Sequence, residues 1–459
     1  MKQKHTNSRF SLNSHLVFTD NTVRRVPKFT EGMFETIKLT NVGPAPEIKM
    51  AFKPRLNILT GDNGLGKSFL LDIIWWCLTR TWPANVNPSL TAGKMALPHS
   101  DKKGEISFAF TGAKKSHAYT SVFEPGLQAW TGKAGRPAIP GLVIYAMSDG
   151  SLATWDPSRN YWRTKDGVDI QDRPPAYVLG PQEVWDGLRT KNNSVICNGL
   201  ISDWVSWQKD TSHPYFANLK VLLRWLSPSD TEIMLPGEPD RISLDDVRDI
   251  PTLQMPYGQS VPIVHASSGM RRIAALSYFL LWTWYEHVVA SKLLRVNPAN
   301  QVIILIDEIE SHLHPKWQRR IVPAVFSAMR EIHKTAQVQL ITATHSPLVM
   351  TSLEPKFDEE QDQWFDINLN DNKVELQACV FERYGDANSW LTSDGFDLSS
   401  TRAIETEQLL NEASYLLRQK EIKKEEALDM HQKLIRTLNE KDPFLVRWRY
   451  TCEMEGWLE

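Results

Sequence analysis

A run of eight residues near the start of the chain has the composition of a phosphate-binding loop. Its glycines allow backbone N–H groups to turn inward around phosphate oxygens, its lysine can reach the β- and γ-phosphates, and the serine hydroxyl can ligate Mg²⁺. The motif predicts ATP with Mg²⁺ as ligand. The residues expected to contact nucleotide, with Lys67 also catalytic and Ser68 also a metal ligand, are Gly61, Asp62, Asn63, Gly64, Leu65, Gly66, Lys67, Ser68 and Phe69.

The segments on either side of this loop support the interpretation. Residues 56–60 form an apolar run that predicts a buried strand, and residues 69–75 predict a helix. A strand, then the loop, then a helix is the context that a phosphate-binding loop requires. A plain Gly/Ser-rich loop, which is the alternative, has neither the lysine nor these flanks.

Two carboxylates follow a second apolar run, residues 301–306. This pattern predicts a parallel strand whose carboxyl end lies beside the phosphate loop. We expect Asp307 to hold the Mg²⁺ shell and Glu308 to orient or deprotonate the attacking water, because positioning and electrostatics supply most of the catalysis in phosphoryl transfer. The alternative is an acidic pair that only ends a strand.

Two further polar segments carry candidate residues. His345 follows the apolar run 337–344, one predicted helix (316–333) after the carboxylates, and this spacing favours contact with the γ-phosphate over a purely structural hydrogen bond. Ser268 and Gly269 directly precede an apolar helix. A hydroxyl and a glycine at a helix N-terminus can bind an anion, although on their own they indicate only a helix cap.

The sequence around these motifs alternates between segments with strand patterns and segments with helix patterns. Short β patterns with Gly and Pro punctuation predict an antiparallel β lobe after the loop helix, and a helical, aromatic stretch follows it. The tail is helical and partly charged. The expected strands are 35–39 and 48–52 before the loop and 105–110, 119–123 and 142–145 in the lobe; the expected helical regions are 181–225, 273–284 and 401–459, with loops through 256.

Composition limits the class of protein. Apolar residues make up 42% and charged residues 23% of the 459 residues, as in ordinary globular proteins of two or three folding units. The apolar stretches fall short of the ~18 residues of a spanning helix, and no apolar signal segment opens the chain. We therefore expect a cytoplasmic protein without a membrane partner. The net charge of −2 gives no overall field that favours nucleic acid.

The order of these motifs resembles that of the ABC-type ATPases over about residues 34–350. The resemblance implies an α/β fold, an ABC-ATPase head in which the phosphate-loop sheet carries an antiparallel β lobe and a helical lobe, plus a helical C-terminal extension. It also implies that Ser268 and Gly269 of one protomer close over the ATP of another, so that the chain is at least a dimer. Residues 310–315 are similar to the loop after the carboxylates in the soluble OLD/RecF-like branch rather than in transporters. We expect this loop to contact another protomer, and metal binding by His312 and His314 is the alternative.

Segments 180–188, 197–201, 267–272 and 442–450 narrow the resemblance to the PtuA-type ATPases of bacterial anti-phage systems. These families include Septu and certain retron systems, in which the ATPase is paired with an HNH endonuclease. The resemblance implies a regulatory ATPase, ATP-dependent oligomerisation and a PtuB-like HNH partner. It also implies that Gln182 stands at the position of the Q-loop glutamine, beside the metal.

No HNH or Toprim-like motif stands out in the sequence, so we expect that this chain does not cut DNA itself. Any nuclease is then a partner, and any contact of this chain with DNA is indirect. A RecF/SMC-like DNA-repair ATPase that binds duplex DNA is the first alternative, and a transporter nucleotide-binding subunit is the second. The expected domains are a basic arm (1–33), the head (34–355; β lobe about 100–165, helical lobe about 181–290), and a C-terminal β segment with a helical tail for partner or oligomer contacts (356–459).

Overall fold

The computed structural model describes residues 32–99, 102–111, 116–132, 139–160, 174–190, 192–419 and 423–457. The predicted basic arm therefore lies almost entirely outside the described residues. Within the described part, none of the helices is long and apolar enough to cross a membrane.

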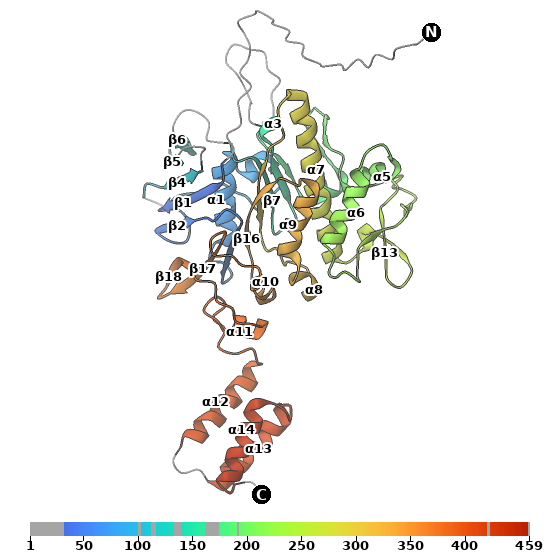
Figure 1. The fold of residues 1–459 in the computed structure, drawn as a ribbon. Helices are drawn as coiled ribbons and strands as arrows, with labels where there is room; N and C mark the ends of the chain where they lie inside the picture. Colours follow the sequence, from blue (N-terminus) through green and yellow to red (C-terminus); the bar gives the residue numbers. More distant parts are fainter. Residues whose placement is uncertain are drawn as a thin grey trace, which may run out of the picture.

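An eight-stranded sheet forms the centre of the described structure (Figure 1), in the order β18-β17-β3-β16-β15-β7-β8-β9. Five neighbouring strands, from β17 to β7, run parallel, and the remaining pairs are antiparallel. The carboxyl ends of β3, β15 and β16 therefore meet at one edge of the sheet, as the sequence predicts. The strands are β3 Leu56–Gly61, β7 Leu142–Ala146, β8 Leu152–Trp155, β9 Tyr177–Leu179, β15 Gln301–Ile306, β16 Gln337–Ala343, β17 Asp362–Asn370 and β18 Lys373–Cys379.

Helices cover both faces of this sheet, and the predicted helical lobe lies beside it. The helix expected over 316–333 is interrupted after Gln318, so that α8 and α9 replace it. The helices before the C-terminal region are α1 Lys67–Thr79, α2 Pro83–Val86, α3 Pro157–Asn160, α4 Pro181–Asp186, α5 Leu200–Lys209, α6 Tyr215–Trp225, α7 Ser268–Leu294, α8 Pro315–Gln318, α9 Ile321–Ile332 and α10 Pro347–Leu353, with a 3₁₀ turn at Ile263–His265.

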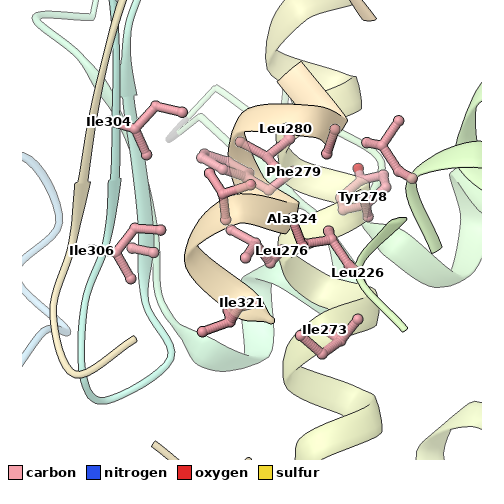
Figure 2. Close-up of a cluster of buried hydrophobic side chains, with 14 of the residues drawn as sticks. Leu226, Ile273, Leu276, Tyr278, Phe279, Leu280, Ile304, Ile306, Ile321 and Ala324 are labelled. Carbon is pink, nitrogen blue, oxygen red and sulfur yellow. The ribbon is translucent and has the colours of Figure 1, made fainter. Parts of the chain in front are cut away.

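Strand β15 shows how one apolar run serves two cores. Side chains alternate along a strand, so Ile304 and Ile306 enter the core that contains α7 and α9, as Figure 2 shows. Ile303 and Leu305 enter the opposite core, which contains α1. Burial on both faces explains why the sequence is continuously apolar here rather than alternating.

The antiparallel β lobe is a five-stranded sheet in the order β2-β1-β4-β5-β6. It includes the two strands that precede the phosphate loop, and it does not include residues 142–145. That part of the prediction is wrong: β7 pairs parallel with β15 in the central sheet. The lobe strands are β1 Phe34–Thr40, β2 Glu47–Ala51, β4 Glu105–Phe110, β5 His117–Glu124 and β6 Ala129–Gly132; smaller sheets join β10 Leu188–Arg189 with β11 Val195–Cys197, and β12 Leu235–Pro236 with β13 Thr252–Gln254 and β14 Ser260–Pro262.

The C-terminal region contributes the edge hairpin β17–β18, and then α11 Ala387–Leu391, α12 Ile404–Arg418, α13 Lys424–Thr437 and α14 Pro443–Met454. The last three helices share a separate small core, which lies apart from the sheet in Figure 1. Trp448 is fully buried in that core. From its sequence, the Trp448–Arg449 segment is compatible with either an amphipathic docking stretch or core packing, and the structure supports packing for Trp448. The predicted α/β fold class with a helical C-terminal extension is confirmed.

Candidate nucleotide-binding and hydrolysis site

The phosphate loop connects β3 to α1 with three glycines in left-handed or related conformations. Gly61, Gly64 and Gly66 have φ values of 124°, 80° and 98°, which L side chains rarely adopt. A Cβ at Gly61 would also lie 2.1 Å from the Ile367 carbonyl oxygen of β17. The first glycine is therefore required both for the turn and for close packing against the neighbouring strand.

Lys67 lies inside this loop, with its ammonium held by the loop backbone. Its Nζ donates to the carbonyl oxygens of Gly61 and Asp62 at 2.7 and 2.8 Å. Burial lowers the pKa of Lys67, while the carboxylates of Asp307, Asp62 and Glu308 oppose that shift. The ammonium is thus enclosed by the loop and bonded to two of its own carbonyl groups.

Asp307 follows β15 directly, and its side chain is almost fully buried. Burial raises the pKa of Asp307, while hydrogen bonds from the Ser68 and Ser148 hydroxyls lower it. The buried Oδ1 of Asp307 has no hydrogen-bond partner within the described residues. Such an orphaned oxygen is costly unless a ligand satisfies it, and Mg²⁺ prefers oxygen ligands, so the residues present fit this metal.

Glu308 adopts a left-handed backbone conformation, with φ 45°. For a residue with a side chain this costs roughly 1–2 kcal/mol, so neighbouring groups must hold it. Arg272 of α7 does so: its Nη2 donates at 3.1 Å to the carbonyl oxygens of both Asp307 and Glu308, and its Nη1 donates to the Ser148 carbonyl at 3.2 Å. The partly buried Glu308 side chain is thereby presented at the end of β15.

Glu310 joins the loop after β15 to the end of β16. Its carboxylate accepts from the Thr344 hydroxyl at 2.7 Å and from the His345 backbone N–H at 2.5 Å. Burial raises the pKa of Glu310, while these two hydrogen bonds oppose the rise. Glu310 therefore fixes the start of the segment that carries His345.

His345 lies close to the phosphate loop, as the sequence predicts. Burial and then the charge of Lys67 lower its pKa, while Glu308, Asp62 and a hydrogen bond involving the Gly61 backbone oppose that shift. The imidazole is therefore favoured in its neutral form. The structure brings Lys67, Asp307, Glu308 and His345 together at one edge of the sheet.

The Ser268–Gly269 segment forms the first turn of α7. The Ser267 hydroxyl caps this helix by accepting from the Met270 N–H at 3.3 Å. The segment borders an open cavity of about 560 Å³, and within the described residues it makes no hydrogen bond to the phosphate loop of its own chain. The cavity is lined by Pro228, Glu232, Ser267, Ser268, Gly269, His312, Leu313, His314, Lys316 and Trp317.

Gln182 lies elsewhere. It is exposed on α4, where its Nε2 donates to Asp186 Oδ2 at 3.3 Å, and no described hydrogen bond joins it to Asp307. The position beside Asp307 belongs instead to Ser148, two residues after β7. A metal role for Gln182 stays a prediction that this geometry does not favour.

Sequence reasoning missed Ser148, Arg272 as a backbone clamp, and Glu310. Ser148 could have been found, because it follows an apolar run just as Asp307 follows β15. Arg272 and Glu310 carry no comparable signal, since their roles depend on carbonyl and N–H groups brought close only by folding.

Asp72, one turn after Ser68 on α1, adds a titratable group behind the site. Burial raises its pKa to about 7, helped by Asp307 and Asp149 and opposed by hydrogen bonds from the Tyr145 hydroxyl and the Gly93 backbone. Because the pKa in the folded state lies above the unfolded value, the carboxyl favours folding fully only when protonated. Its contribution to stability is lost as pH rises from about 4 to about 7.

Asp72→Asn should therefore raise the melting temperature at pH 8 by several degrees and change it little near pH 4, because the amide keeps an acceptor for Tyr145 and removes the charge. Thermal unfolding at both pH values measures this. Asp245→Asn, at an exposed position, is the control and should give no pH-dependent difference. Equal effects of Asp72→Asn at both pH values would contradict the expected titration.

Comparison with known proteins finds sequence similarity to AAA domains and to probable ATPases. Residues 206–351 match the family model described as "AAA domain, putative AbiEii toxin, Type IV TA system", and residues 36–165 match one described as "AAA domain". Each model covers less than half of the chain. The match over residues 206–351 contains the segments around Ser268 and Asp307. The match over residues 36–165 contains the candidate residues of the phosphate loop.

The curated proteins that are similar in sequence include two retron probable ATPases and a Septu protein. The chain is 34% identical over 102 residues (21% of its length) to the Retron Vc95 probable ATPase of Vibrio cholerae serotype O1 biovar El Tor, and 30% identical over 165 residues (35%) to the Retron Ec83 probable ATPase of Escherichia coli. These matches span only 17% and 27% of those proteins. It is 21% identical over 319 residues, 69% of this chain and 72% of the other, to the Septu protein PtuA of Bacillus thuringiensis.

Solved structures show a remote likeness. The SMC head domain from Thermotoga maritima aligns with a TM-score of 0.36 and 13% identity, covering 76% of this chain and 99% of that one. The recombination mediator protein RecF aligns with a TM-score of 0.36 and 13% identity, covering 75% and 98%. The sequence matches are more informative: the chain resembles AAA-type ATPases, among them the retron probable ATPases and the Septu protein PtuA.

Proposed function

We propose that this chain binds and hydrolyses ATP with Mg²⁺, and that it does so as the regulatory subunit of a bacterial anti-phage complex. The observation that supports the chemistry most strongly is the buried Asp307 carboxylate with an unpartnered oxygen, at the same sheet edge as Lys67, Glu308 and His345. Purified chain should release phosphate from ATP, and this release should require Mg²⁺.

Each side chain has a separate task in this proposal. The loop N–H groups and Lys67 bind the β- and γ-phosphates, and the phosphate oxygens take the place of the Gly61 and Asp62 carbonyls around Nζ. Glu308 orients the attacking water and accepts its proton. His345, favoured in its neutral form, can donate one N–H to a γ-phosphate oxygen.

Asp307 and the hydroxyl of Ser68 would hold Mg²⁺, which neutralises charge on the β- and γ-phosphates when bound. No group of three or more His, Cys, Asp or Glu side chains in the described residues is arranged to hold a metal ion. Phosphate-loop ATPases do not need one, because hydroxyl and phosphate oxygens complete the shell. This arrangement agrees with the single buried carboxylate.

Ser148→Ala should weaken the apparent affinity for Mg²⁺ in ATP hydrolysis by about 10-fold, because groups that orient a metal ligand typically contribute 10–100-fold. Gln182→Ala, on the exposed face of α4, should leave it unchanged. A titration of hydrolysis rate against Mg²⁺ at saturating ATP measures both. The reverse result would return the metal role to Gln182.

The proposed site is completed by a second copy of the chain. Ser268 and Gly269 make no described hydrogen bond with their own phosphate loop and border an open cavity. Helix N-termini bind phosphate well, so the first turn of α7 is suited to the γ-phosphate of ATP held by another protomer. ATP then stabilises a dimer or a larger oligomer.

The defence role rests on the resemblance to the retron probable ATPases and the Septu protein PtuA. In this proposal the ATP-bound oligomer controls an associated HNH endonuclease in the cytoplasm. A tagged pull-down from the native gene neighbourhood should recover that nuclease with the chain. Phage protection that survives Lys67→Ala and Glu308→Gln together would exclude ATP control, and recovery of the chain alone, with salt-sensitive binding to duplex DNA, would favour a RecF/SMC-like repair ATPase.

A further inference from the structure

The first turn of α7 is attached to the catalytic edge of its own sheet by Arg272. The guanidinium bonds to carbonyl oxygens on two separate segments: Ser148 after β7, and Asp307 and Glu308 after β15. All three groups belong to the metal and water-activating part of the site. One side chain therefore spans from the helix that carries Ser268 to the hydrolytic residues.

A second contact ties the same turn to the same loop. A Cβ at Gly269 would lie 2.9 Å from the His312 carbonyl oxygen, four residues after Glu308. Next along the helix, Ile273 packs in the core that Figure 2 shows together with Leu276. The start of α7 is thus held on one side by the core and on the other by the segment that follows β15.

The guanidinium of Arg272 is surrounded by protein groups, unlike the side chain of a surface arginine. Burial lowers its pKa, and the carboxylates of Glu308, Asp307, Glu310 and Asp149, in that order, oppose the shift. Arg271, its neighbour, is exposed and shows none of these hydrogen bonds. Two adjacent arginines therefore differ in role, although the sequence alone does not separate them.

We infer that Arg272 couples the two halves of the composite site within one protomer: when Ser268 and Gly269 engage the ATP of a partner copy, Arg272 carries the resulting shift of α7 to Glu308 and Ser148 of its own chain. This inference rests on the proposed ATPase function. Arg272 itself is a positioning residue, because it touches backbone carbonyls and not the reacting atoms. Occupation of a protomer's own Ser268–Gly269 segment thereby accelerates hydrolysis of the ATP that this protomer holds, and an empty segment leaves a slower basal rate.

The test is a double-mutant cycle on the full chain. Arg272→Gln should lower kcat by roughly 10–100-fold and leave the Kd for ATP within about 3-fold, as expected when only catalytic positioning is lost. Arg272→Lys should recover part of the rate, since one ammonium can reach some of the carbonyls, and Arg271→Gln should match wild type. Ser268→Ala weakens the contact of the α7 N-terminus with the partner's ATP, so it removes the signal that Arg272 is proposed to transmit.

If Arg272 and Ser268 act through the same coupling, combining the two substitutions should add little. The kcat of the double variant Ser268→Ala/Arg272→Gln should then lie within about 3-fold of the kcat of the slower single variant. Losses that multiply would show independent roles and overturn the inference, as would an Arg271→Gln variant as slow as Arg272→Gln. Unchanged melting temperatures check that each variant folds. Failure of the proposed function appears separately, as wild-type chain that neither binds nor hydrolyses ATP.

Discussion

Glu308→Gln should slow ATP hydrolysis by a factor on the order of 10²–10⁴, because a positioned general base contributes about that much. The amide keeps the size of the side chain but cannot accept the proton of the attacking water. The Kd for ATP should stay near the wild-type value, since Lys67 and the loop glycines are untouched. The variant should therefore accumulate with ATP bound.

Single-turnover hydrolysis and equilibrium ATP binding, measured on the same preparations, separate the two effects. Glu359→Gln makes the same chemical change at an exposed position and should behave as wild type. If Glu308→Gln hydrolyses ATP as fast as Glu359→Gln, then Glu308 is only an acidic strand terminus and another group activates the water.

Lys67→Ala should weaken ATP binding by about 100-fold or more. The ammonium is the cation enclosed by the phosphate loop, and each charge-assisted hydrogen bond to a phosphate oxygen contributes about 1.5–3 kcal/mol. Without nucleotide the variant should be nearly as stable as wild type, because the two freed carbonyls belong to the exposed Asp62 and the partly exposed Gly61.

The melting temperature with and without ATP gives a direct readout. At ATP concentrations 100 times its Kd, wild-type chain gains about 2.7 kcal/mol of stability, whereas Lys67→Ala should gain almost none. Lys373→Ala, at the exposed start of β18, is the matched control and should keep the full gain. ATP stabilisation retained in Lys67→Ala would place the nucleotide elsewhere.

The most buried parts of this site were predictable from the sequence. Strands β3, β15 and β16 are covered on both faces, so each is rich in apolar residues and ends beside a candidate functional segment. Lys67, Asp307 and His345 accordingly lie where their spacing indicates. The roles assigned to them stay predictions until the variants are measured.

Other parts depend on information that one strand does not carry. The apolar run 142–145 does not reveal whether its neighbouring strand is parallel or antiparallel. Because the sequence pattern assigns the run to the β lobe and not to the central sheet beside β15, Ser148 is not recognised as a candidate site residue. The helix predicted over 316–333 is broken at Arg319 and Arg320, between α8 and α9. The hydrogen bonds of Arg272 and Glu310 to backbone groups arise only from the folded arrangement of distant segments.

In the proposed shared site, ATP held by Lys67 of one chain is hydrolysed with the help of Ser268 and Gly269 of another. Mixing two inactive chains tests it most directly: Lys67→Ala keeps an intact α7 N-terminus, and Ser268→Arg keeps an intact phosphate loop. When the two are mixed before Mg²⁺ and ATP are added, each mixed pair regains one complete site. Half of the randomly formed pairs are mixed and each has one of two sites, so the mixture should reach about one quarter of the wild-type rate without coupling through Arg272 and a lower rate with it. A mixture no more active than the sum of its two components would contradict a site shared between chains.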